Sequence, residues 1–200
     1  MSRRSHHGLS AVEAIITLAL FAVVATLVMS VFTRSIRISA RESVNLELEQ
    51  TCHFLFRQVQ QDLTSSGVSG LSYLETPDWH GVGIHSIEDI TSEGTLAWSG
   101  TLRFYFWDKK TESLYKQNLT ISPDPLANPI QFTPNELLGI AGGTSTERAQ
   151  IAKRVKEFRV VNRKPGGNSR LVDVSVELER ELPNDDTRRF RLDSLVTVLN

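Results

Sequence analysis

The longest apolar segment of the chain runs from Ala14 to Thr33, where twenty consecutive residues carry no charge. A helix of that length rises about 30 Å, which matches the hydrocarbon thickness of a lipid bilayer. A buried core helix in a protein of this size normally shows a polar stripe, whereas this segment is apolar on every side. The pattern therefore predicts a membrane-spanning helix over residues 14–33.

A second helical pattern follows the apolar segment without interruption. Apolar side chains recur at steps of three or four residues, the spacing of one helical face, at Val44, Leu48, Cys52, Leu55, Val59 and Leu63. The acids of this stretch, Asp62 among them, fall mostly at other positions. Because no glycine or proline interrupts it, we expect one helix over residues 9–63, roughly 80 Å long. Its first half would make no contact with the rest of the chain, and its second half would pack on a globular domain.

Residues 64–200 predict a globular body that is rich in antiparallel strands. Apolar side chains alternate over residues 102–106, a polar turn follows at 108–112, and the return run over 113–121 indicates a hairpin. The same alternation recurs over residues 172–178 and 190–198. A long helix followed by such a body predicts the α+β class, with the helix packed on an antiparallel sheet.

Three other stretches of the body suggest turns, a loop and a short helix. Glycines and a proline between Gly67 and Gly83 mark turns, and the proline-rich stretch 123–143 is typical of a long loop. Thr144 and Glu147 fit a helix cap, which favours a short helix over residues 145–153. A strand over residues 154–163 is equally compatible with the pattern.

Composition narrows the classes of function. The chain has 200 residues, of which 40% are hydrophobic and 22% charged, so it has room for one modest core and an accessory segment. Its net charge of −1 provides no positive field for a phosphate backbone, and no nucleic acid is expected as a partner. Cys52 is the only cysteine and leaves the redox compartment open. No cofactor is expected.

The amino terminus combines a short basic leader with an isolated acid. Residues 1–8, MSRRSHHG, carry two arginines and no acid, and Leu9 follows. An ordinary secretory signal places its cleavage site after the apolar run, and here that run continues without a suitable exit. Glu13 stands one residue before the apolar segment. In a membrane its carboxylate either needs a cationic partner or lies solvated among the headgroups.

These residues resemble the class III leader of the type IV prepilin and type II secretion pseudopilin superfamily. The shared features are glycine at the end of a basic leader, an apolar residue next, and glutamate as the fifth residue of the mature chain. The resemblance implies that a prepilin peptidase cuts between Gly8 and Leu9 and methylates the new amino group of Leu9. It also implies that Glu13 pairs with the amino terminus of a neighbouring subunit.

Within that superfamily the chain is most similar to J-type minor pseudopilins, or to W-type minor pilins. The similarity rests on LFRQVQQDL late in the helix and on the hairpin LRFYFWDKKTESLYK, while the absence of proline at Ser30 favours a minor subunit. It implies a single-pass inner-membrane protein with a periplasmic body, at or near the tip of a pseudopilus, whose partners are other pseudopilins or pilins. The alternative within the superfamily is a minor pilin of a type IV pilus or DNA-uptake pseudopilus.

A third interpretation is a signal-anchored periplasmic domain that binds a ligand or catalyses a reaction. His80 and His85, near Glu88 and Asp89, are the residues that would carry it, but their spacing matches no metal-ligand template. No catalytic motif is recognisable, so an enzyme is not expected. Arg188, Arg189 and Arg191 fit a solvated strand face, with an acidic partner surface as the sharper alternative.

Overall fold

The computed structural model describes residues 11–90, 92, 94–143, 147–163, 170–182 and 186–199. Over these residues the chain forms two helices and eight strands. It divides into two compact units, Met1–Ser43 and Val44–Asn200. The first unit contains the amino-terminal part of a long helix, and the second contains the remainder of that helix and every strand.

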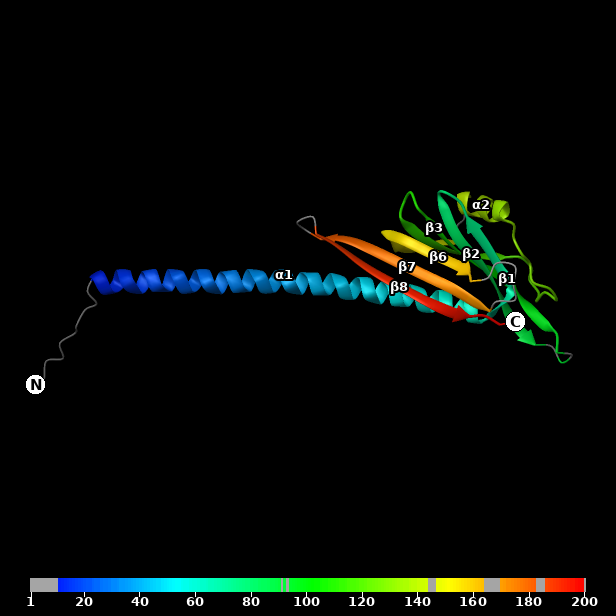
Figure 1. Cartoon of the computed structure of the whole chain (residues 1–200), viewed down its shortest axis with the longest axis horizontal. Coiled ribbons are helices and arrows are strands. Elements are labelled where there is room, and N and C mark those ends of the chain that lie inside the picture. The colour runs from blue at the N-terminus through cyan, green and yellow to red at the C-terminus, as the bar shows by residue number, and fades with distance from the viewer. Residues whose placement is uncertain are drawn as a thin grey trace, which may run out of the picture. The chain divides into compact units, whose positions relative to one another are not determined.

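The long helix, α1 (Ala11–Thr64), contains 54 residues (Figure 1). Its continuity follows from the lack of glycine and proline in this stretch. The predicted apolar stripe is buried in the second unit, with Leu48, Cys52, Leu55, Val59 and Leu63 all inside the core. Val44, the first residue of the stripe, is partly buried against the same core. Residues 9 and 10, where the helix was expected to begin, lie outside the described residues.

Five strands form one antiparallel sheet in the order of the sequence, namely β1 (Ser66–Glu75), β2 (Trp79–Ile90), β3 (Leu96–Asp108), β4 (Ser113–Thr120) and β5 (Arg148–Lys153). Three more form a second antiparallel sheet, namely β6 (Val155–Asn162), β7 (Leu171–Leu182) and β8 (Asp186–Thr197). The predicted α+β class, with a helix packed on antiparallel sheets, is confirmed. The hairpin predicted from residues 102–121 is the β3–β4 pair.

The five-stranded sheet has two buried faces because a helix covers each of them. On β3, Tyr105 joins the core beneath the last turns of α1, whereas Phe104 and Phe106 point to the opposite face. The short helix α2 (Pro134–Gly142) covers that opposite face with Leu137 and Ala141. The three-stranded sheet has one apolar face that adds valines of β7 to the α1 core, and its other face is polar.

The glycines between Gly67 and Gly83 do not mark turns, as the sequence suggested, because they lie inside β1 and β2. Gly81 has a steric reason to be a glycine. A Cβ atom there would approach the Tyr105 carbonyl oxygen to 2.6 Å and the Phe106 Cβ to 2.9 Å. Gly81 therefore permits close backbone packing within the sheet, which is the other common role of glycine in strands.

The short helix of the body lies earlier in the chain than predicted. The stretch 123–143 is not one long loop, because α2 begins at Pro134 with Thr133 and Glu136 as a reciprocal capping box. The Glu136 carboxylate accepts from the Thr133 backbone N–H at 2.7 Å. Of the helix predicted over residues 145–153, residues 148–153 form β5 instead, and residues 144–146 lie outside the described residues. The strand alternative over 154–163 is confirmed as β6. Both threonine–glutamate pairs have the capping spacing, but only the first precedes a run of helix-compatible apolar residues.

Candidate functional site

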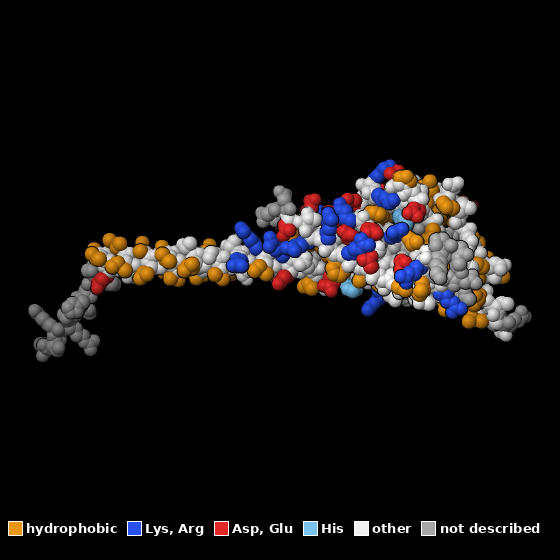
Figure 2. All heavy atoms as spheres, in the orientation of Figure 1, with side chains coloured by type: hydrophobic (Ala, Val, Ile, Leu, Met, Phe, Trp, Pro, Cys, Tyr) orange, Lys and Arg blue, Asp and Glu red, His pale blue; other side chains and the backbone are white. Residues whose placement is uncertain are grey.

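The apolar segment of α1 exposes hydrophobic side chains around its whole circumference. Between Val12 and Phe32 the large apolar side chains are mostly more than half exposed, and the most hydrophobic 18-residue window has a mean hydropathy of 2.7 and no buried residue. In Figure 2 orange side chains cover this part of the helix, between patches of white backbone. α1 is therefore long and apolar enough to cross a membrane.

The few polar side chains of this segment satisfy their own hydrogen bonds. Each hydroxyl between Ala14 and Thr33 donates to a backbone carbonyl three or four residues earlier, at 2.7–2.8 Å; the donors are Thr17, Thr26, Ser30 and Thr33. An unpaired hydroxyl in hydrocarbon is costly, and this back-bonding removes most of that cost. The segment is therefore compatible with lipid over its full length.

Glu13 lies in the first turn of the described part of α1, directly before the apolar segment. It is the only acid among residues 11–41. The backbone N–H groups of a helix start favour a negative charge at this position. Gly8 and Leu9, the predicted cleavage and methylation residues, lie outside the described residues, so these two assignments stay predictions.

The carboxylate of Asp62 connects the last turns of α1 to the five-stranded sheet. Asp62 is only 7% exposed. Its Oδ1 accepts from Arg103 Nη1 at 2.7 Å, and its Oδ2 accepts from the Tyr105 hydroxyl at 2.5 Å and from Lys116 Nζ at 3.2 Å. Burial and the bond to Asp62 raise the pKa of Tyr105, which stays a hydrogen-bond donor. This cluster fixes α1 against β3 and β4.

Asp62 is an exception to the expectation that the acids of this stretch fall mostly outside the buried stripe of the helix. The sequence does indicate the buried position of Asp62. This residue follows Val59 by three residues and Leu55 by seven, which places all three on one face of the helix. The cost of burying the carboxylate is offset by two cations and a hydroxyl from two strands. Those partners are distant in sequence, so the helix pattern alone could not identify them.

The two histidines considered as metal ligands do not share a site. His80 and His85 are five residues apart on β2, so their side chains leave opposite faces of the sheet. His80 Nε2 accepts from the Val160 N–H at 3.3 Å. His85 Nδ1 accepts from the Ile130 N–H at 3.1 Å, so its Nε2 carries the proton and donates to the Ser99 carbonyl. Both imidazoles hold backbone segments in place.

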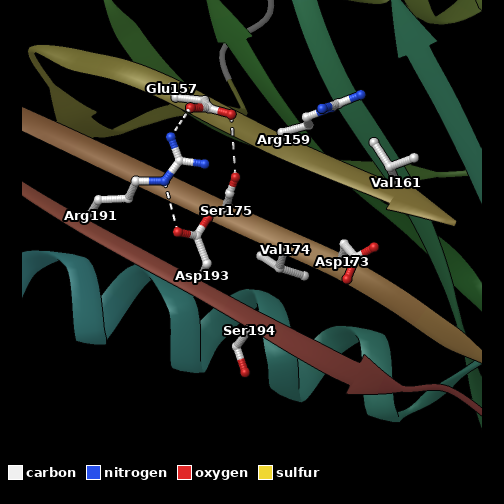
Figure 3. A pocket seen from close by; sticks show the side chains of 9 residues that line it. All are labelled: Glu157, Arg159, Val161, Asp173, Val174, Ser175, Arg191, Asp193 and Ser194. Carbon is white, nitrogen blue, oxygen red and sulfur yellow. Dashed lines mark hydrogen bonds and ion pairs between the residues drawn. The ribbon is translucent and has the colours of Figure 1, made fainter. Parts of the chain in front are cut away.

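The arginines of β8 already have acidic partners within the chain. Arg191 lies 2.7 Å from both Glu157 and Asp193, and Figure 3 shows its guanidinium directed toward both. Arg189 pairs with Glu179, and Arg188 lies 3.2 Å from Asp186. The hydrogen bond from Arg191 lowers the pKa of Asp193. The shallow hollow of about 460 Å³ on this sheet face is therefore lined by charges of both signs, without a basic excess.

Cys52 belongs to the core. Its side chain is fully buried, and its Sγ lies 3.7 Å from the Phe190 carbonyl oxygen. Burial raises the pKa of the thiol to about 11. Because the thiolate is the reactive form, Cys52 is not a nucleophile at neutral pH.

Comparison of the chain with known protein families, curated proteins and solved structures finds no match.

Replacing Asp62 with asparagine should lower the free energy of unfolding by about 3 kcal/mol, because Arg103 and Lys116 would lose their buried counter-charge. Chemical denaturation of the chain measures this loss. Asp78→Asn is the matched control, because it removes a carboxylate that pairs with Lys110 at the surface. The control should change stability by less than about 0.5 kcal/mol. Equal effects of the two substitutions would show that the Asp62 cluster does not anchor the helix.

His80 should make folding stability depend on pH. Burial lowers the pKa of His80 below its ordinary value of 6.5, so the unfolded chain takes up a proton near that pH while the folded chain resists it. The unfolded state then binds more protons, and stability declines from pH 7 to pH 5. Denaturation midpoints should decline less in His80→Gln than in the wild type. His53→Gln, which alters an exposed imidazole, should leave the decline unchanged; an unaltered decline in His80→Gln contradicts the assignment.

Proposed function

We propose that this chain is a minor pseudopilin of a type II secretion system, a structural subunit at or near the tip of a periplasmic pseudopilus. In this proposal the protein is held in the inner membrane by α1 before assembly, with its body in the periplasm. Its partners are other pseudopilins, and a prepilin peptidase processes it. Its role is structural, and no chemical reaction is assigned to its body.

The main support for the proposal is that the two parts of α1 have different surroundings. Over residues 14–33 α1 exposes apolar side chains in every direction, and from Leu48 onward the same helix buries a stripe against antiparallel sheets. Such a segment is suited first to lipid and then to contact with similar helices in a filament. The acid at its start and the leader before it match what the superfamily resemblance implies.

The proposed chemistry of assembly concerns Gly8, Leu9 and Glu13. Cleavage after Gly8 creates an amino group on Leu9, which methylation leaves positively charged. In a bundle of apolar helices that amine and the Glu13 carboxylate of a neighbouring subunit offset each other's desolvation, which neither group could bear alone. The pair would therefore select correctly staggered neighbours and disfavour misaligned ones.

The runner-up is a minor pilin of a type IV pilus or DNA-uptake pseudopilus, which would use the same residues with different neighbours. Genes for secretion components beside this gene favour the first assignment, and genes for pilus assembly favour the second. The anchored binding domain or enzyme depended on His80 and His85. It has less support, because these residues lie on opposite sheet faces and bond to the backbone.

Replacing Glu13 with alanine should leave the protein in the membrane but reduce its incorporation into filaments several-fold, because the amino terminus of the neighbour loses its counter-charge. The measurement is the amount of the chain in sheared filaments relative to the membrane fraction, in cells that express the remaining subunits.

The control is Glu42→Ala, which removes an exposed carboxylate from the same helix beyond the apolar segment. This variant should assemble like the wild type. Normal incorporation of Glu13→Ala would contradict the assembly role of Glu13, whatever the control shows.

A further inference from the structure

Three arginines follow the apolar segment of α1 directly. Arg34, Arg37 and Arg41 are all exposed, and their spacing of three and four residues places them on one face of the helix. We refer to these three residues as the arginine band. In Figure 2 blue side chains begin where the orange stretch of the helix ends. The assembly role proposed for Glu13 does not involve this band.

The band lies at the depth of lipid headgroups when residues 14–33 occupy the hydrocarbon. Arg34 stands at the hydrocarbon edge, and Arg37 and Arg41 follow about 4.5 and 10.5 Å further along the axis. The headgroup layer beyond each edge is about 5–8 Å thick. Side chains of a helix lean toward its amino terminus, so all three guanidinium groups reach back toward the membrane.

The electrostatics of the band favour an anion. Residues 14–41 contain no acid, so no carboxylate of the helix stands three or four residues from Arg34 or Arg37. Arg34 and Arg37 are instead each other's neighbours at a spacing of three residues, which is unfavourable unless an anion lies between them. Guanidinium groups bind phosphate oxygens through paired hydrogen bonds, and they do so more strongly than ammonium groups.

The residues between the arginines also fit a membrane interface. Ile36 and Ile38 are 55% and 46% exposed, so apolar side chains alternate with cations along this stretch. A helical segment with that mixture lies at the boundary between headgroups and acyl chains. An acidic protein surface would account for the arginines, but it would not account for their start at the first residue after the apolar segment.

We infer that the arginine band binds the phosphate groups of anionic phospholipids and thereby sets the depth of α1 in the membrane before assembly. The inference rests on the membrane-spanning part of the proposed function and is independent of filament formation. Each arginine near an anionic lipid surface contributes about fivefold to affinity, so the three together contribute on the order of 100-fold. Added salt should weaken this binding by screening.

Native mass spectrometry of the full chain in detergent tests the inference by counting retained lipids as phosphatidylglycerol or phosphatidylcholine is added. The test variant combines Arg34→Gln, Arg37→Gln and Arg41→Gln, because glutamine keeps the helix propensity of arginine. The control variant combines Arg57→Gln, Arg159→Gln and Arg163→Gln, which removes the same charge from exposed sites outside the band. Circular dichroism establishes that each variant is folded.

The wild type and the control should prefer phosphatidylglycerol, and the test variant should bind it on the order of 100-fold more weakly, close to its affinity for phosphatidylcholine. Equal phosphatidylglycerol binding by the test variant and the wild type would overturn the inference. An equal loss in the control would also overturn it, because the effect would then reflect overall charge. Cross-linking to other subunits in cells is the second measurement: unchanged lipid binding together with lost cross-links would overturn the inference and assign the band to an acidic protein partner. Fractionation of the same cells is the third: absence of the wild type from the membrane fraction would refute the proposed function itself.

Discussion

The buried carboxylate of Asp62 determines how the last turns of α1 lie on the sheets. Hydrophobic burial has no direction, so an apolar stripe by itself restricts the register of a helix less strictly than a buried charge does. The buried carboxylate is stable only where Arg103, Tyr105 and Lys116 meet it. The cluster therefore defines one register for the part of α1 that packs on the sheets. The same helix exposes apolar side chains over residues 14–33 and buries a stripe from Leu48 onward.

Local sequence patterns predicted the elements in which hydrophobic residues recur regularly along the chain. The buried stripe of α1 and the β3–β4 hairpin each follow from one period of hydrophobic residues, and the apolar segment follows from an unbroken run of them. The turn predicted at Pro77 is confirmed between β1 and β2. The turns assigned to the glycines of this stretch were wrong, and Gly81 is required instead by the backbone of β3, which is distant in sequence. The short helix of the body was predicted at the wrong place for a similar reason. Two threonine–glutamate pairs share the capping spacing, and the second precedes a segment that pairs with β4.

The residues of the candidate site also fall into two groups, those that a local sequence motif predicts and those whose partners are distant in sequence. Gly8, Leu9 and Glu13 were predicted from a contiguous motif and stay predictions, and the structure adds the exposed, internally hydrogen-bonded helix that follows Glu13. Asp62 was missed because its partners come from β3 and β4, and only the folded chain brings them within hydrogen-bonding distance. The suggested His80–His85 pair failed for a simple reason: five residues along a strand reverse the direction of a side chain. Spacing in sequence implies proximity only when the type of element is known.

The most direct test of the account is the mass of the amino-terminal peptide of the protein purified from membranes of cells that contain a prepilin peptidase. We predict a chain that begins at Leu9 and carries one methyl group on its amino nitrogen. A chain that retains residues 1–8 in those cells would contradict it, because Glu13 would then have no new amino terminus with which to pair.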